Sequence, residues 1–166
     1  MAAEVLALLD PKPGDVVVDG TIGYGGHARL FLDRIGPQGR LIGLDVDGQE
    51  LERTRRRLGA DGRVRLHRRN FAELPDVLTA EGIAGANVIF ADLGVSSMQV
   101  DDAGRGISYK HPNSPLDMRM DDRLSHTGAD LLNSLPEEAI SAALRDLADE
   151  PDHARIAAFL CQQRQV

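Results

Sequence analysis

Short apolar runs alternate with amphipathic stretches over the first 92 residues of the chain. Residues 15–19 (DVVVD) are rich in β-branched side chains and follow a Pro/Gly turn, a pattern typical of a strand buried on both faces. The alternation predicts an α/β fold with an open parallel sheet and right-handed crossovers. The predicted strands are 15–19, 40–45, 63–67 and 87–92, and the predicted helices between them are 27–36, 49–58 and 71–80.

The pattern changes after residue 92. Residues 93–122 form a long polar stretch without periodicity, and loops of that length in compact domains are usually functional or disordered. Helical spacing returns at 127–134, 136–148 and 152–163, and no further strand is indicated. We therefore expect a core domain at 1–122, which includes 93–122 as an active-site loop, and a helical segment at 123–166.

The composition excludes several classes of protein. No stretch approaches the roughly 18 consecutive apolar residues that a membrane helix needs, so a transmembrane protein is excluded. The single cysteine cannot form an internal disulfide and the N-terminus lacks a basic leader, so a cytoplasmic location is expected. A formal net charge of −7 means that any surface for nucleic acid must be local.

Glycines and carboxylates follow the predicted strands, where parallel sheets bind their ligands. Gly23, Gly25 and Gly26 lie between the first strand and its helix, where glycine allows close backbone approach to a ligand. Asp45 ends the second strand, where a carboxylate can accept hydrogen bonds from ribose hydroxyls. The sequence thus predicts a site for a nucleoside-containing cofactor. The alternative is that the glycines only make a turn and that Asp45 caps the following helix.

The same segment narrows the choice of cofactor. The string G-x-G-G-H does not match the dinucleotide fingerprint G-x-G-x-x-G, and the phosphate-binding Walker pattern is absent. Asp19, beside the glycines, would repel a pyrophosphate but would attract the ammonium and sulfonium of S-adenosylmethionine (SAM). Charge therefore favours the methyl donor over NAD.

Five ordered motifs carry a resemblance to a known family: DGTIGYGGH, LIGLDVDGQEL, NFAEL, DLGVSSMQVDDAGRGISY and PLDMRMD. Together they resemble the MraW family, the bacterial methyltransferases of cytosine N4 in small-subunit ribosomal RNA. The resemblance implies a Rossmann-like class I methyltransferase core interrupted by helices, with SAM as cofactor and 16S rRNA of the small ribosomal subunit as partner. Family members are nearly twice as long, so we expect an incomplete sheet with an open edge at its fourth strand.

The resemblance also implies roles for individual residues. Alternatives remain for several of them: Phe71 can be a core aromatic, Asp92 a turn residue, and Gln99 a solvated side chain. His27 can equally be an ordinary residue at a helix start. The implied cofactor contacts are Gly25, Gly26, His27, Asp45, Phe71, Asp92 and Gln99.

The implied reaction transfers a methyl group to an exocyclic amine, which needs a proton acceptor within hydrogen-bond reach. Asp92 is the first candidate for this catalytic role and Asp117 the second. No metal or covalent nucleophile is required. Methylation at carbon 5 would need a nucleophilic cysteine, but Cys161 lies inside a predicted helix and is interpreted as a core residue.

RNA contacts are expected in the long polar stretch, because it offers stacking and phosphate-binding side chains. The target cytosine should be unpaired and flipped into the site. Eight arginines between residues 53 and 69 are a second candidate surface, with an ordinary solvated face as the alternative. The candidate RNA-binding residues are Arg105, Tyr109, Lys110 and Arg119.

Two functions from different classes stay open. The first is an active rRNA methyltransferase, and the second is a catalytically silent fragment that binds cofactor or RNA. Met98 and Ser114 depart from the family's usual proline and glycine at those positions, which bears more on catalysis than on cofactor binding. A homodimer, or a missing C-terminal partner segment, would complete such a chain.

Overall fold

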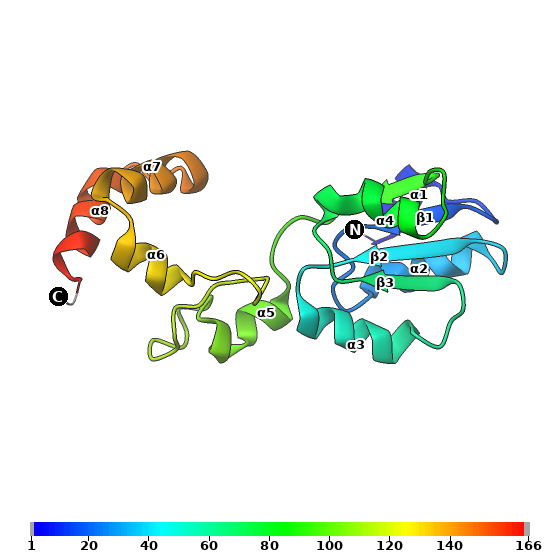
Figure 1. Cartoon of the computed structure of the whole chain (residues 1–166), viewed down its shortest axis with the longest axis horizontal. Helices are drawn as coiled ribbons and strands as arrows, with labels where there is room; N and C mark the ends of the chain where they lie inside the picture. Colours follow the sequence, from blue (N-terminus) through cyan, green and yellow to red (C-terminus); the bar gives the residue numbers. More distant parts are fainter. Residues whose placement is uncertain (1, 165–166) are drawn as a thin grey trace. The chain divides into compact units, whose positions relative to one another are not determined.

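The computed structural model describes residues 2–164 (Figure 1). These residues form two compact units, one made of the residues up to 96 with 120–122 and the other of residues 97–119 with those from 123 onward. Residues 97–119 thus group with the C-terminal helices, whereas the sequence suggested that they belong to the core domain. Within the part described, no helix has the length and apolarity needed to cross a bilayer.

The first unit is built on a four-stranded parallel sheet with strand order β3-β2-β1-β4. This order matches the first four strands of the doubly wound Rossmann arrangement, and it confirms the predicted α/β fold. β4 lies at one edge of the sheet, as expected, and its Ile89 is 59% exposed. The strands are β1 (Val16–Asp19), β2 (Arg40–Leu44), β3 (Val64–His67) and β4 (Val88–Phe90).

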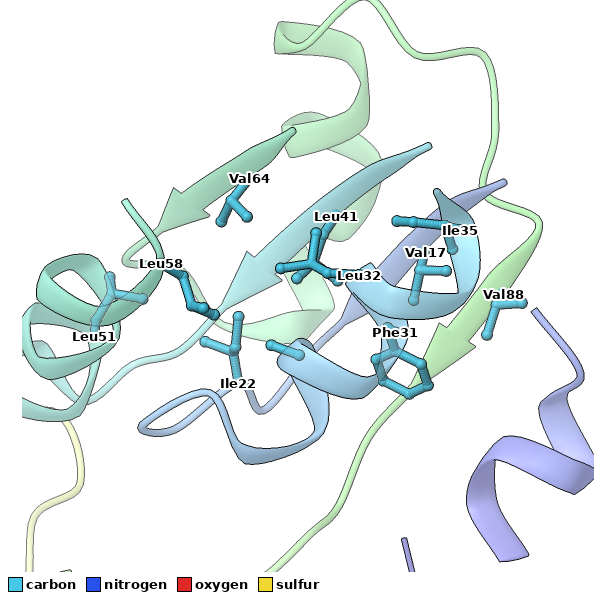
Figure 2. Close-up of a cluster of buried hydrophobic side chains, with 11 residues drawn as sticks. Val17, Ile22, Phe31, Leu32, Ile35, Leu41, Leu51, Leu58, Val64 and Val88 are labelled. Atoms are coloured by element: carbon cyan, nitrogen blue, oxygen red, sulfur yellow. The ribbon is translucent and has the colours of Figure 1, made fainter. Parts of the chain in front are cut away.

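Helices cover both faces of this sheet because adjacent strand residues point to opposite sides. Val17 and its neighbours pack with α2 and α3 in one cluster, which Figure 2 shows, whereas Val18 and its neighbours pack with α4 in another. Burying each such side chain contributes about 1.5–3 kcal/mol. The helices of this unit are α1 (Ala2–Leu9), α2 (Gly26–Ile35), α3 (Gly48–Leu58) and α4 (Leu74–Ala80), with the 3-10 helix η1 (Phe71–Glu73) before α4.

Helix α1 was not predicted. Its sequence AAEVLALL is apolar on nearly all sides, so it shows no clear amphipathic period, and none of its residues is buried. Val5, Leu6 and Leu9 are partly buried against the cluster that contains α2. Tertiary packing therefore determines this helix more than its local pattern does.

The second unit is helical within the residues described. Its three longer helices lie within about one residue of the predicted ranges. The expectation of an unbroken loop at 93–122 was wrong, because this stretch contains a short α-helix and a 3-10 helix. Asp102 stabilises the latter by accepting a hydrogen bond from the Gly104 amide at 2.9 Å. The elements are α5 (Ser97–Asp101), η2 (Ala103–Arg105), α6 (Gly128–Ser134), α7 (Glu137–Ala148) and α8 (His153–Gln162).

Candidate cofactor-binding site

The glycine loop, residues 20–26, connects β1 to α2 and folds back onto β2. The Ile22 amide donates to the Leu44 carbonyl at 3.0 Å, and the Gly25 amide donates to the Ile22 carbonyl at 2.8 Å. The Ile22 side chain is buried over Gly43, where a Cβ would stand only 2.3 Å from Ile22 Cδ1. A glycine in the middle of β2 therefore makes room for the loop.

Gly25 is required at its position for two reasons. Its φ of +84° lies in the left-handed region, which glycine enters without steric cost. A Cβ there would also stand 3.1 Å from Leu58 Cδ1 and 3.2 Å from Thr54 Cγ2, both on α3. The loop therefore sits close against α3 just before α2 begins.

Asp45 follows β2 and fastens the glycine loop to it. Its carboxylate accepts hydrogen bonds from the Gly23 amide at 2.7 Å and from the Asp47 amide at 2.9 Å. Burial raises the pKa of Asp45, while these backbone hydrogen bonds act in the opposite direction. The N-cap of α3 is Asp47, which accepts from the Gln49 amide at 2.9 Å. The alternative in which Asp45 caps the helix is thereby excluded.

Two further carboxylates follow the neighbouring strands β1 and β4. Asp19 is 1% exposed and accepts a hydrogen bond from the Thr21 amide at 3.2 Å. Burial, reinforced by repulsion from Asp45 and Asp92, raises the pKa of Asp19 from 3.8 to about 7. Asp92 is exposed, and its amide donates to the Thr21 hydroxyl at 2.7 Å. Three acids at adjacent strand ends favour a cationic ligand over a pyrophosphate.

Two aromatic rings border the loop. Phe71 begins η1, with three residues between it and the end of β3, and it is 49% exposed, so it is not a core aromatic. A Cβ at Gly20 would stand 3.2 Å from Phe71 Cβ, which places this residue beside the start of the glycine loop. The His27 ring, in the first turn of α2, packs on Phe90 of β4 with 4.8 Å between ring centroids.

The structure thus brings six of the seven predicted cofactor residues to the carboxyl edge of one sheet, and their roles stay predictions. The seventh, Gln99, is 8% exposed in α5 of the second unit, so it is not a solvated side chain. The six are Gly25, Gly26, His27, Asp45, Phe71 and Asp92.

Asp117, the second candidate proton acceptor, is held by Arg119 within the second unit. Arg119 Nε donates to one carboxylate oxygen at 2.7 Å and Nη2 donates to the other at 2.8 Å. This pairing lowers the pKa of Asp117 to about 2, which makes it a weak base.

The four candidate RNA-binding residues fall into two groups. Arg119 also donates to the Leu124 carbonyl at 2.6 Å, and the Arg105 side chain is only 12% exposed. Both guanidinium groups therefore contribute to the structure of the second unit. Tyr109 is 91% exposed and Lys110 is exposed as well, so these two side chains are accessible to a ligand.

The arginines between residues 53 and 69 each have a partner on the protein. Examples are Arg53 with Glu50 at 2.6 Å and Arg69 with Glu73 at 2.7 Å. Arg63 pairs with Asp61 at 2.6 Å and also donates to two backbone carbonyls of the first unit. These pairings favour the interpretation of this surface as an ordinary solvated face.

Sequence reasoning did not find two side chains that connect the glycine loop to the elements around it. Thr21 links the loop to Asp92, and Thr54 of α3 donates to the Gly23 carbonyl at 2.6 Å. In the sequence, Thr54 is marked only as a polar residue on the inner face of an amphipathic helix. The partner of that residue, 31 positions earlier in the chain, cannot be read from such a pattern.

Comparison with known proteins identifies the family of this chain. The model of the MraW methylase family matches residues 1–166. Ribosomal RNA small subunit methyltransferase H of Geotalea daltonii is 46% identical over 166 residues, which cover 99% of this chain and 53% of that protein. Its namesake from Syntrophotalea carbinolica is 46% identical over 158 residues, which cover 95% and 50%.

A solved structure of a SAM-dependent O-methyltransferase from Thermotoga maritima is 20% identical, with a TM-score of 0.44, over 55% of this chain and 34% of that one. The chain spans about half the length of the curated relatives it matches. The family match, in contrast, extends over the whole chain, which therefore belongs to the MraW methylase family.

Proposed function

We propose that the carboxyl edge of the sheet binds SAM. Asp45 would hold the ribose hydroxyls, because its partly exposed carboxylate lies beside the glycine loop and a carboxylate can accept several hydrogen bonds. The exposed ring of Phe71 would cover the adenine, and Asp19 would face the cationic end of the cofactor. The observation that carries the proposal is the Asp45 carboxylate, which is hydrogen-bonded to the Gly23 amide and lies on the strand end next to that of the buried Asp19.

The reaction we propose is methylation of the N4 amine of a cytidine in 16S rRNA of the small ribosomal subunit. Membership of the MraW methylase family and similarity to ribosomal RNA small subunit methyltransferases H support this choice. When bound, SAM supplies an activated methyl group. The N4 lone pair is delocalised into the ring, so a carboxylate that accepts a hydrogen bond from the amine assists its attack. Asp92 has this role in the proposal because it is exposed beside the glycine loop.

Asp117 is the less suitable proton acceptor, because Arg119 engages both of its oxygens. In the same unit, Tyr109 and Lys110 are proposed to contact the RNA by stacking and by charge. We propose that Arg105 and Arg119 support these contacts indirectly, by holding the shape of the segment that carries them.

We propose a cytoplasmic location, because the proposed substrate is RNA of the small ribosomal subunit. Because the chain spans about half of its relatives, the activity is proposed for a form that covers their full length. We propose that the chain functions either as a homodimer or together with a C-terminal partner segment. The alternative function is a silent cofactor- or RNA-binding fragment.

Transfer of a radiolabelled methyl group from SAM to small ribosomal subunits tests the proposed reaction. Replacing Asp92 with Ala should reduce the rate about 100-fold, since a positioned acid or base typically contributes 10²–10⁴-fold. The control is Asp76→Ala, which removes an exposed acid from α4. Equal transfer by the Asp92 variant and the wild type would remove Asp92 from the mechanism. Binding of SAM without any transfer would favour the silent fragment.

A further inference from the structure

Helix α3 carries a buried hydroxyl that is bonded to the glycine loop. Thr54 lies in the middle of this helix and is 0% exposed. Its Oγ1 donates to the Gly23 carbonyl at 2.6 Å, across 31 positions of sequence. Its methyl group faces Gly25, where a Cβ would stand 3.2 Å from Thr54 Cγ2. One side chain therefore both bonds and packs against the loop.

Both backbone groups of Gly23 are held from outside the loop. Asp45 accepts the amide hydrogen at 2.7 Å, and Thr54 satisfies the carbonyl oxygen. Farther out on α3, Arg57 donates to the Tyr24 carbonyl at 2.8 Å, and its guanidinium lies 5.3 Å from the centre of the Tyr24 ring. The contact of Arg57 is exposed, whereas that of Thr54 is partly buried and starts from a fully buried side chain, so the loss of Thr54 should have the larger effect.

We propose that Thr54 is a positioning residue for the cofactor, which it reaches only through the glycine loop. The inference rests on the proposed function of that loop. Without the hydroxyl the partly buried Gly23 carbonyl loses its partner on α3, and the loss of this hydrogen bond favours other loop conformations. If only a fraction of the molecules keeps the bound conformation, the apparent Kd for SAM rises by the inverse of that fraction.

Two substitutions separate the hydroxyl from the methyl group of this side chain. Thr54→Val keeps the shape and removes the hydrogen bond, whereas Thr54→Ser keeps the hydrogen bond and removes the methyl packing. The matched control is Thr79→Val in α4, where the Thr79 hydroxyl donates to the Pro75 carbonyl at 2.8 Å on the exposed surface. The control loses the same type of hydrogen bond, here one made within α4.

Isothermal titration with SAM, alongside thermal unfolding without ligand, tests the proposal on the whole chain. We expect Thr54→Val to raise Kd about tenfold, and Thr54→Ser and Thr79→Val to stay within about twofold of the wild type. The Ser variant should bind better than the Val variant even where its Tm is lower, which a purely structural role would not produce.

The proposal is overturned if Thr54→Val binds SAM as tightly as the wild type, or if the Val and Ser variants weaken binding equally. Should the Val variant fail to fold, comparison of Thr54→Ala with Thr54→Ser provides the same contrast. Absence of binding by the folded wild type would contradict the proposed function itself, so the two failures are distinguishable.

Discussion

Burial gives the Asp19 carboxyl of the proposed site a pKa close to neutral pH. In the unfolded chain its carboxyl ionises near pH 3.8, whereas in the folded chain burial raises its pKa to about 7. The folded state therefore holds the proton more tightly than the unfolded state. The contribution of Asp19 to the free energy of unfolding consequently falls as the pH rises from about 4 to about 7.

This linkage predicts opposite effects of Asp19→Asn on stability and on binding. At pH 8 the neutral amide removes a buried charge, so the Tm of the ligand-free protein should rise by about 3 °C or more. The Asn side chain keeps an oxygen for the Thr21 amide, so the local hydrogen bond can persist. A calorimetric scan in which the variant melts at a lower temperature than the wild type at pH 8 would contradict the claim that the buried charge of Asp19 destabilises the folded protein.

Binding should show the complementary pH dependence. If the ionised form of Asp19 attracts the cationic cofactor, the Kd of the wild type should fall about tenfold between pH 6 and pH 8, across the folded pKa of about 7. The Asn variant should bind more weakly at pH 8 and lose this dependence. Titration calorimetry at three pH values checks both points, and identical pH profiles for the two proteins would count against the role of Asp19.

At the scale of elements, the connection between β1 and α2 depends on glycine where it touches α3. Gly25→Ala places a methyl group at a φ of +84° and against Leu58 and Thr54. We expect this change to destabilise the protein by about 1–3 kcal/mol and to abolish detectable binding of SAM. Gly85→Ala is the control, because a Cβ at that position meets nothing within 4 Å.

Urea denaturation and titration calorimetry on the two glycine variants measure these effects. The loop geometry described here would be refuted if Gly25→Ala matched Gly85→Ala in both stability and binding. Loss of stability in both variants would indicate that replacing glycine is destabilising in general. It would not support a steric clash between α3 and a methyl group at position 25.

The elements differ in how well a sequence can predict them. β1 and β2 were predicted correctly because their short apolar runs are buried on both faces of a parallel sheet. Helix α5 was not, because five residues are too few to show a helical period. The acids at the strand ends could be predicted from position alone. The hydrogen bond from Thr54 could not, since it depends on how α3 packs on the loop.

At the scale of the whole molecule, Asp45 and Thr54, which hold the glycine loop by hydrogen bonds to Gly23, both belong to the first unit. The proposed RNA contacts, Tyr109 and Lys110, belong to the second unit. Cofactor binding and RNA binding should therefore respond to different substitutions. Replacing both Tyr109 and Lys110 with Ala should leave the Kd for SAM within about twofold of the wild type while it weakens binding to RNA.

Fluorescence anisotropy with a labelled single-stranded RNA, beside titration with SAM, checks this separation. A double variant that binds RNA as well as the wild type would remove these two side chains from the RNA contact. A large change in its affinity for SAM would show that the two functions are not separate.

The most direct test of the account is isothermal titration of the folded chain with SAM, with its demethylated product S-adenosylhomocysteine, and with NAD. We predict that SAM and S-adenosylhomocysteine each bind saturably, at about one molecule per chain, and that NAD does not bind. We also predict that Asp45→Ala loses most of this affinity, because the substitution removes both the ribose acceptor and the anchor of Gly23. Absence of heat with SAM and its product, or undiminished binding by Asp45→Ala, would contradict the account.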